Sequence, residues 1–228
     1  MQSTFDTVIR NSPPLQRARI VRWVFGALAA TLPVLLLAAS SAPGPSPAQL
    51  LQRLRRGGFV LVMRHAQSPA QPPSAASAEP DNPRHERQLS EAGKRSAREL
   101  GEDLRALVVP LGPIYVSPAY RAIETVRLAG LGAFHIVRQL AEGPRGMSGS
   151  ANRADVRWLQ DASAHAPPSG SNTLIVTHEP NIVGAFGSAA RSIGAAGMLV
   201  FQPDRHGGAR LIGRLTAQQW HALAARHR

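Results

Sequence analysis

The sequence contains no cysteine in its 228 residues. This absence excludes disulfide bridges, thiolate metal sites and a cysteine nucleophile. It does not identify the cellular compartment, because many exported proteins also fold without disulfides. Aromatic residues are scarce, at 5% of the chain, but the apolar fraction of 43% is enough to build a hydrophobic core. The composition therefore excludes a chain that is disordered throughout.

Lysine is almost absent, since Lys94 is the single lysine among 26 basic residues. With only 14 acidic residues, the formal net charge is +12. A charge of this sign suits a nucleic acid, an anionic membrane surface or an anionic small molecule as partner. The arginines form no dense block interleaved with aromatic residues, which argues against nucleic acid. Arginines that bind a phosphate group are the more specific interpretation.

The start of the chain has the composition of an export signal. Four arginines between residues 10 and 22 precede an uncharged apolar run at 23–39, and small residues follow up to Ala42. This order of a positive segment, an apolar core and small residues is typical of a signal peptide. The alternative is an uncleaved membrane anchor, although the run is slightly short for the roughly 20 residues that span a bilayer. Pro33 also interrupts the run.

Both interpretations predict an exported domain. Arginines before an apolar run keep that end of the chain in the cytoplasm, which sends the following residues outward. We therefore assign residues 1–42 to a signal peptide or N-terminal membrane anchor and residues 43–228 to one domain. The expected location is the periplasm or another exported site, with anchoring to the inner membrane by residues 20–40 as the alternative to cleavage.

The remaining chain alternates between strand and helix patterns. Short apolar runs predict strands at 59–63, 114–116, 134–137, 174–176, 198–201 and 210–215. Helical spacing and capping residues predict helices at 48–56, 119–128, 151–164 and 181–190 and after Thr216. They also predict a helix that Ser90 caps and that Pro110 and Gly112 stop. Residues 67–88, rich in Pro, Ala and Ser, predict a long loop. This alternation predicts an α/β three-layer sandwich, with a mixed, mostly parallel sheet and helices on both faces.

Charged and imidazole side chains follow three of the predicted strands. Arg64 and His65 end the first, Arg121 lies shortly after the second, and His178 follows the strand at 174–176. Ligands of such sheets bind beyond the carboxyl ends of the strands, so these residues converge there. Guanidinium groups bind phosphate oxygens. Their positive charge also keeps a nearby imidazole neutral, with a lone pair that can attack phosphorus.

Four segments of the chain occur in an order that carries a resemblance. They are Met63-Arg64-His65-Ala66, Leu89-Ser90-Glu91-Ala92-Gly93, Ser117-Pro118-Ala119-Tyr120-Arg121-Ala122-Ile123-Glu124-Thr125 and Val176-Thr177-His178. In this order they resemble the motifs of the histidine phosphatase (phosphoglycerate mutase-like) superfamily, over residues 59–186. Ala66 stands where the family usually has glycine, which requires that the backbone there avoid a positive φ.

The resemblance implies a role for each of the four convergent residues. It places a phosphohistidine on His65, phosphate binding on Arg64 and Arg121, and transition-state support and substrate binding on His178. It implies the phosphoglycerate mutase-like fold, and it implies neither a metal nor a cofactor. The implied partner is a small-molecule phosphomonoester rather than nucleic acid.

The proton donor to the leaving group is less firmly indicated by the sequence. A carboxylic acid kept protonated by its surroundings can serve. Glu142 resembles the acid of the mutase-like branch, and Glu179, next to His178, resembles that of the phytase-like branch. Asp81, in the long loop, is a third candidate. We favour Glu142, because the predicted helix start at Glu179 stabilises an ionised carboxylate there.

These observations predict an exported phosphatase that hydrolyses a phosphomonoester through a phosphohistidine on His65. One alternative is a noncatalytic relative that binds phosphate without turning it over. The other is a phosphoglycerate mutase-like phosphotransferase. The sequence leaves open the natural substrate, the oligomeric state and the cleavage of the signal.

Overall fold

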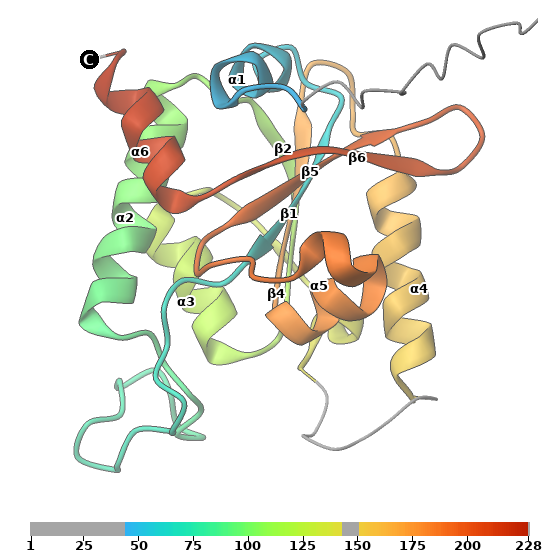
Figure 1. The fold of residues 1–228 in the computed structure, drawn as a ribbon. Helices are drawn as coiled ribbons and strands as arrows, with labels where there is room; N and C mark the ends of the chain where they lie inside the picture. Colours follow the sequence, from blue (N-terminus) through green and yellow to red (C-terminus); the bar gives the residue numbers. More distant parts are fainter. Residues whose placement is uncertain (1–43, 143–150, 228) are drawn as a thin grey trace, which may run out of the picture. The chain divides into compact units, whose positions relative to one another are not determined.

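A computed structural model of the chain describes residues 44–142 and 151–227 (Figure 1). The predicted signal peptide or anchor, residues 1–42, lies outside this described part, and the domain boundary at residue 43 stays a prediction. Among the helices in these two ranges, none combines the length and the apolar character needed to cross a membrane.

The described domain is built on one six-stranded sheet. Its strands are β1 (Val60–Arg64), β2 (Leu111–Val116), β3 (His135–Ile136), β4 (Asn172–Thr177), β5 (Met198–Pro203) and β6 (Ala209–Leu215). Their order in the sheet is β3-β2-β4-β1-β5-β6. The first four are parallel, whereas β5 runs antiparallel to β1 and to β6. The predicted mixed, mostly parallel sheet is therefore confirmed.

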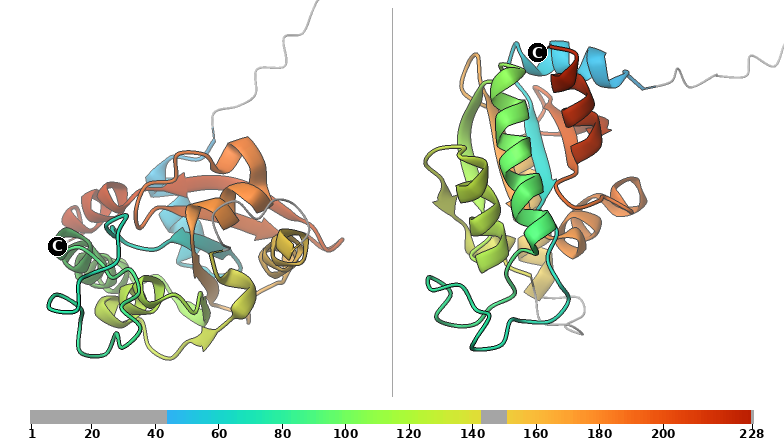
Figure 2. Two further views of the ribbon diagram at one scale, coloured as in Figure 1. Left: turned by 90° about the horizontal axis from the view of Figure 1, so that it is seen from below. Right: turned by 90° about the vertical axis from the view of Figure 1, so that its left-hand side faces the viewer.

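Helices cover both faces of the sheet (Figures 1 and 2). They are α1 (Pro47–Leu54), α2 (Glu91–Ala106), α3 (Tyr120–Ala129), α4 (Ala151–Ala164), α5 (Glu179–Phe186) and α6 (Ala217–Ala225), with short 3₁₀ turns η1 (Arg138–Leu140) and η2 (Gly187–Ala190). One hydrophobic cluster joins the sheet to α1, α2, α3 and α6, and a second joins the other face to α4 and α5. The predicted three-layer sandwich is confirmed.

The central strands are buried on both faces, as their continuous apolar sequence predicts. In β1, Leu61 and Met63 belong to one hydrophobic cluster, whereas Val60 and Val62 belong to the other. All four side chains are fully buried. Because the side chains of a strand alternate between faces, β1 joins both layers of helices and fixes the position of the residues that follow it.

The start of α2 shows why its motif ends in glycine. The side chain of Ser90 caps the helix by accepting a hydrogen bond from the backbone N–H of Gly93 at 3.0 Å. A Cβ atom at Gly93 would lie 2.0 Å from the carbonyl oxygen of Gln67. Glycine therefore lets α2 approach the segment just after β1.

The end of α2 differs from the sequence prediction. The helix ends at Ala106, and Val108 adopts a positive φ of 51° with 71% of its side chain exposed. This turn reverses the chain before Pro110, and Gly112 lies inside β2. The helix thus stops before Pro110, as predicted, but the prediction that Gly112 helps to end it was wrong. The turn that ends it could not be recognised from the sequence, because valine rarely adopts a positive φ.

Candidate active site

The carboxyl ends of β1, β4 and β2 lie side by side in the sheet, on the same end of the domain as the long loop at residues 65–90 (Figure 1). His65 directly follows β1, His178 follows β4 and is the N-cap residue of α5, and Ser117 follows β2. Arg121 lies in the first turn of α3. The parallel register of the three strands therefore brings these side chains to one place, as the sequence predicts.

His65 is buried, with 5% of its surface exposed, and both ring nitrogens have partners. Nδ1 lies 2.7 Å from the carbonyl oxygen of Ala66, so Nδ1–H donates to that carbonyl. Nε2 accepts a hydrogen bond from Nε of Arg121 at 3.1 Å. These two contacts assign the proton to Nδ1 and leave the lone pair on Nε2, which is the arrangement that a nucleophilic imidazole requires.

The surroundings of His65 keep its ring neutral. The pKa of His65 is lowered from 6.5 to about 3, chiefly by burial and in addition by the positive charges of Arg121 and Arg64. The hydrogen bond to the Ala66 carbonyl acts in the opposite direction and is outweighed. A group with a pKa near 3 is unprotonated at neutral pH, so the Nε2 lone pair is available there.

His178 lies beside His65, with the two ring centroids 5.1 Å apart. Its Nδ1 accepts from Nη2 of Arg121 at 2.9 Å, which places the proton on Nε2. Nε2 then donates to Oγ of Ser117 at 2.8 Å. Only 1% of the residue is exposed, and burial, with Arg121 as the next cause, lowers the pKa of His178 to about 2.

Arg121 connects the two histidines to a carboxylate. Besides donating to His65 and His178, its Nη2 donates to Oε2 of Glu142. The residue is buried, and burial lowers the pKa of Arg121 from its ordinary value while the charge of Glu142 raises it. A guanidinium so placed presents several donors to an anion that approaches the Nε2 atom of His65.

Arg64 is the second guanidinium of the group and is only partly engaged. Its Nη1 donates to the carbonyl oxygen of Ile193 at 3.0 Å and lies 2.7 Å from Oε2 of Glu179. Its Nε atom is buried and has no hydrogen-bond partner among the described residues. A buried donor without a partner is costly, and an anionic ligand would satisfy it.

Glu142 is held at the site by the segment that precedes it. Oγ1 of Thr177 donates to the carbonyl oxygen of Leu140 at 2.9 Å, and Nδ2 of Asn181 donates to that of Ala141 at 2.9 Å. Thr177 is the last residue of β4, and Asn181 lies in α5, which follows it. The segment before Glu142 is therefore fixed beside the end of β4, where His178 lies. The Glu142 carboxylate is therefore paired with Arg121 at the place where an anionic ligand would bind.

The other two candidate acids lie differently. Glu179 begins α5 and contacts Arg64, so it lies at the margin of the same group. Asp81 accepts a hydrogen bond from the Tyr120 hydroxyl and pairs with Arg127 at 3.1 Å, with 60% of its side chain exposed. The structure brings Glu142 and Glu179 to the arginines, and it does not bring Asp81 there.

Comparison with protein families identifies the domain. The family model of the histidine phosphatase superfamily (branch 1) matches residues 60–147, a range that includes His65, Arg121 and Glu142. Residues 60–147 therefore carry a histidine phosphatase superfamily domain. The resemblance seen in the motifs is confirmed.

Solved structures agree with the histidine phosphatase fold. The structure of the protein histidine phosphatase SixA complexed with tungstate matches with a TM-score of 0.51 and 17% identity, covering 70% of this chain and 97% of that chain. The structure of the open reading frame Rv3214 from Mycobacterium tuberculosis matches with a TM-score of 0.51 and 21% identity, covering 71% of this chain and 100% of that chain. At such identities the likeness concerns the fold. No curated protein matches the sequence.

The histidine phosphatase domain also contains site residues that the sequence prediction missed. Nη1 of Arg87 lies 3.7 Å from the Glu142 carboxylate oxygen that contacts Arg121, and Nε of Arg87 donates to Pro69 at 2.7 Å. Ser117 belongs to one of the four motifs, in which the sequence assigned it no separate role, and it orients His178. Ser117 could have been assigned from that motif, whereas a single arginine in a long loop gives no signal of its own.

Thr125 is the third missed residue of the histidine phosphatase domain. Its Oγ1 accepts from the backbone N–H of Ala66 at 3.1 Å and donates to the carbonyl oxygen of Arg121 at 2.7 Å. It thus links the residue after the first histidine to the arginine on α3. Ala66 itself is not among the residues with a positive φ, so alanine fits where the family usually has glycine.

Within residues 44–142 and 151–227, no group of three or more His, Asp or Glu side chains could hold a metal ion.

Proposed function

We propose that this protein hydrolyses a small phosphomonoester through a phosphohistidine on His65. The observation that carries the proposal is the hydrogen-bonding of His65. Its Nδ1–H is held by the Ala66 carbonyl, so the lone pair of Nε2 is directed towards Arg121 and His178. A neutral imidazole beside two guanidinium groups has the charge and the geometry of a phosphoryl acceptor.

The first step transfers the phosphoryl group. The Nε2 lone pair of His65 forms the N–P bond while the ester P–O bond breaks, and its electrons leave with the alcohol oxygen. Arg121 and the unpartnered Nε of Arg64 bind the phosphoryl oxygens. Such prearranged donors supply most of the catalysis in phosphoryl transfer, because they need no reorganisation as charge develops.

The second step regenerates the enzyme. A water molecule attacks phosphorus, the P–N bond breaks, and its electrons return to Nε2 of His65. The proton that the water loses passes to the carboxylate that protonated the alcohol. Inorganic phosphate then leaves, and His65 is neutral with its proton still on Nδ1.

His178 supports the phosphoryl oxygens in this scheme. Its Nδ1 accepts from Arg121 in the present structure. A dianionic phosphoryl group beside the ring favours the protonated imidazole, and Nδ1–H then donates to a phosphoryl oxygen. Ser117 keeps the ring in this orientation through its contact with Nε2.

Glu142 is the proton donor that the geometry favours. Its carboxylate accepts a hydrogen bond from the same Arg121 nitrogen that a phosphoryl group would use. The substrate therefore displaces the carboxylate from this nitrogen, and the carboxylate stays next to the bound phosphoryl group. Two neighbouring anions favour protonation of one of them, which gives the acid that the leaving oxygen needs. Glu179 is instead paired with Arg64.

Arg87 is a third cation for the phosphoryl group in this proposal. It lies near the same carboxylate oxygen as Arg121, so an anion that replaces this carboxylate meets both guanidinium groups. The positive charge of Arg87 also contributes to the lowered pKa of both His65 and His178.

Export is part of the proposal and rests on the sequence. Residues 1–42 are proposed to direct the domain across the inner membrane, either as a signal peptide that is cleaved or as an anchor that is not. A fusion of residues 1–50 to a reporter that is active only in the periplasm should give signal. A silent reporter with a soluble cytoplasmic product would contradict export without affecting the proposed chemistry.

The covalent step can be tested by rapid-quench labelling with a radioactive phosphomonoester. Phosphohistidine is labile in acid and stable in base, so the wild-type label should show that profile. His65→Ala should lose both the label and turnover, whereas His135→Ala, at an exposed position on β3, should keep both. Turnover by His65→Ala would contradict the mechanism.

Tight binding of vanadate without turnover by the wild type would favour the noncatalytic alternative. Transfer of the phosphoryl group to an added acceptor instead of water would favour the phosphotransferase.

A further inference from the structure

The net charge of the described domain is concentrated in two segments. Residues 44–58 and 203–227 contain seven arginines and one acidic residue, a formal charge of +6. The other described residues contain thirteen cationic and twelve acidic side chains, a formal charge of +1. The excess is therefore local, whatever the cause of the high arginine content of the chain.

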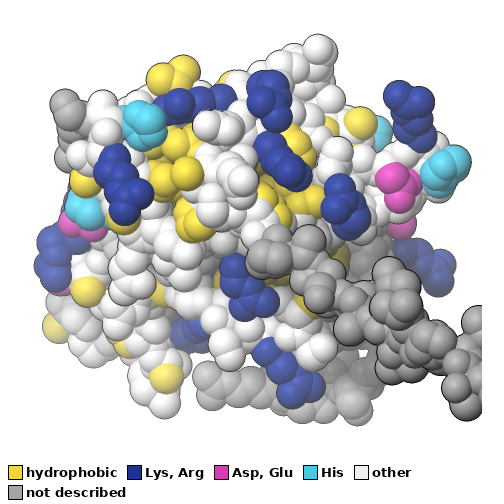
Figure 3. Space-filling view, turned by 45° about the horizontal axis from the view of Figure 1, so that its top comes forward, with side chains coloured by type: hydrophobic (Ala, Val, Ile, Leu, Met, Phe, Trp, Pro, Cys, Tyr) yellow, Lys and Arg dark blue, Asp and Glu magenta, His cyan; other side chains and the backbone are white. Residues whose placement is uncertain are grey.

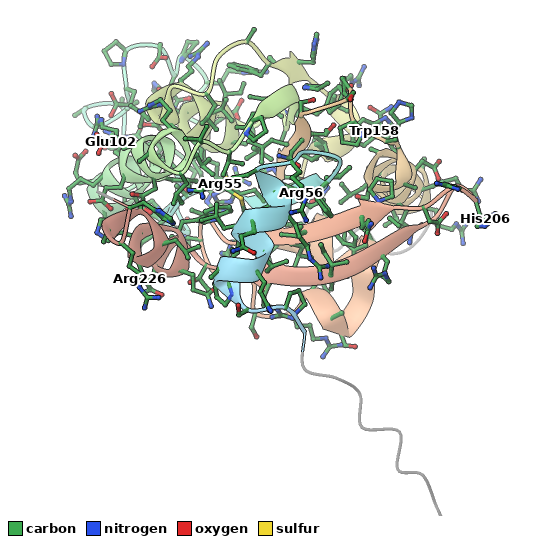
Figure 4. All side chains as sticks on the ribbon, turned by 90° about the horizontal axis from the view of Figure 1, so that it is seen from above. Arg55, Arg56, Glu102, Trp158, His206 and Arg226 are labelled. Carbon is green, nitrogen blue, oxygen red and sulfur yellow. The ribbon has the colours of Figure 1, made fainter. Side chains whose placement is uncertain are left out.

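The two segments form one surface. α1 packs against β6 and α6, and a Cβ atom at Gly213 of β6 would lie 2.6 Å from the Leu50 side chain of α1. We call this surface the α1–β6 face. Its seven arginines are Arg53, Arg55, Arg56, Arg205, Arg210, Arg214 and Arg226. Figure 3 shows many basic side chains on this side of the domain and few acidic ones, and Figure 4 shows Arg55, Arg56 and Arg226 from above.

Within residues 44–142 and 151–227, these arginines have no carboxylate partners. None of the seven takes part in an ion pair with another described residue, whereas Arg64, Arg87 and Arg121 at the opposite end of β1 all do. The one acidic residue of the two segments, Asp204, is occupied by the backbone N–H groups of His206 and Gly208 at 2.8 and 2.9 Å. The α1–β6 face therefore presents cations that are free to meet an external anionic surface.

An exposed apolar side chain accompanies this charge. Nε of Arg55 donates to the carbonyl oxygen of Leu107 at 2.8 Å, which places Val108 next to the α1–β6 face. Val108 lies in the turn after α2, where it adopts a positive φ, and it is 71% exposed. Basic residues around an exposed apolar side chain are the combination found on proteins that bind the surface of an anionic bilayer.

The sequence before α1 gives this surface a partner. Seven residues, 40–46, separate the apolar run at 23–39 from the start of α1 at Pro47. A chain extends by at most about 3.3–3.6 Å per residue, so this tether spans no more than about 25 Å. If the run stays in the bilayer, α1 is kept close to the lipid headgroups at a high effective concentration.

We propose that the α1–β6 face binds the anionic phospholipid surface of the membrane in which the N-terminal run is anchored. This inference rests on the proposed anchoring and not on the proposed phosphatase chemistry. The active-site residues lie at the carboxyl end of β1, and α1 precedes its other end (Figure 1). Docking through the α1–β6 face therefore leaves the catalytic residues directed away from the bilayer and accessible to a soluble substrate.

The absence of cysteine allows the contact to be measured on the full chain. A fluorophore is attached to Gln52→Cys, which is exposed on α1, and in a second protein to Ala75→Cys, which is exposed in the long loop. Each is reconstituted into phosphatidylcholine vesicles with or without about one quarter phosphatidylglycerol and with a headgroup-attached nitroxide quencher. The label at residue 52 should be quenched in the anionic vesicles only, and the label at residue 75 in neither.

A charge-reversal variant identifies the surface. Arg56→Glu, Arg205→Glu and Arg226→Glu are combined, because these side chains are exposed and form no side-chain hydrogen bond with another described residue. Since each arginine near an anionic surface contributes about 1 kcal/mol, the contact equilibrium should fall at least about 100-fold. The matched control combines Arg95→Glu, Arg98→Glu and Arg138→Glu, which are exposed elsewhere, and should keep the quenching.

The outcomes separate the docking from its premises. Quenching at residue 52 that is equal in neutral and anionic vesicles, or unchanged in the charge-reversal variant, would overturn the docking. Loss of an affinity for duplex DNA in that variant, with vesicle quenching unchanged, would assign the face to nucleic acid and also overturn it. If the chain fails to float with the vesicles, both the anchoring and the docking are wrong. Phosphatase activity, measured in parallel, reports on the proposed function independently.

Discussion

Arginines lie at both ends of β1, and their surroundings differ. At the carboxyl end, Arg121 is buried and donates to two histidines and a carboxylate, and its neighbours there are also engaged by acceptors. At the amino end, the exposed arginines of the α1–β6 face have no carboxylate partners among the described residues. Arginine thus provides oriented hydrogen bonds in one region and a general positive electrostatic potential in the other.

The difference has a physical consequence for mutation. A buried guanidinium is held in one orientation, so its removal leaves several acceptors unsatisfied and changes the charge state of the histidines beside it. An exposed guanidinium is hydrated and screened by salt, so the loss of one has a small effect that adds to the loss of others. The four predictions below test this contrast, from the largest expected effect to the smallest.

The largest effect is expected for Glu142→Gln with an alkyl phosphate as substrate. An alkoxide needs a proton as it leaves, so the loss of a general acid should reduce kcat by the roughly 10²–10⁴-fold typical of such catalysis. With p-nitrophenyl phosphate, whose phenolate leaves without this help, the same variant should lose little. Glu179→Gln is the matched control and should show no such dependence on the leaving group. The opposite result for the two variants would assign the acid to Glu179.

Arg121→Lys should reduce kcat by about 10²–10³-fold, the loss expected for one prearranged donor at a site of developing charge. Lysine retains the charge but cannot donate in the planar, divided geometry that reaches His65, His178 and the phosphoryl group together. The control is Arg56→Lys on the α1–β6 face, which should leave kcat unchanged. Steady-state kinetics of both variants check the prediction, and equal rates for Arg121→Lys and the wild type would contradict the assigned role.

Stability should fall as the pH decreases below about 6.5, because of the two buried histidines. Their pKa values are lowered to about 3 for His65 and about 2 for His178, so the unfolded chain binds protons first. Between pH 6 and pH 4, each histidine should therefore remove about 1.4 kcal/mol from the free energy of unfolding per pH unit. Urea unfolding measures this slope. His178→Gln should make it shallower by about half, and Arg56→Gln should not; equal slopes in wild type and His178→Gln would contradict the lowered pKa.

The smallest effect is expected for Arg87→Ala, which should raise KM about tenfold and change kcat less. The reason is that Arg87 lies farther from the carboxylate oxygen than Arg121 does and is fixed through Pro69 rather than through the histidines. The loss of one charged donor to a bound anion corresponds to about 1.4 kcal/mol, which is tenfold in binding. Arg84→Ala, three residues before it in the same loop, is the control and should leave KM unchanged. A purely kcat effect would indicate that Arg87 acts on the histidines instead.

Much of this arrangement could be predicted from the sequence. Strand periodicity and the residues after each strand brought His65, Arg121 and His178 to one edge, because parallel strands align their carboxyl ends. The turn that ends α2 was missed because Val108 adopts a conformation that valine rarely takes. The strand predicted at 134–137 shortens to the two residues of β3, since only these pair with β2.

Contacts within the site were less predictable, because they depend on how a long loop folds over the strand ends. Nothing in residues 67–88 distinguishes Arg87, which approaches Glu142, from Arg84, which pairs with Glu86. Asp81 was a reasonable candidate from its position in that loop, yet Tyr120 and Arg127 hold it on the outside of α3. Residue type and spacing do not specify such contacts between distant segments.

One feature of the sheet has a consequence for solubility. β6 is the last strand in the sheet order, and its seven residues leave a row of backbone groups that another extended chain could pair with. Arg210 and Arg214 are exposed on this strand, and the register shift opposite Val200 and Phe201 disturbs its regular pairing. Charges and irregularities on an edge strand oppose the addition of a further strand. We therefore expect Arg210 and Arg214 to oppose edge-to-edge aggregation.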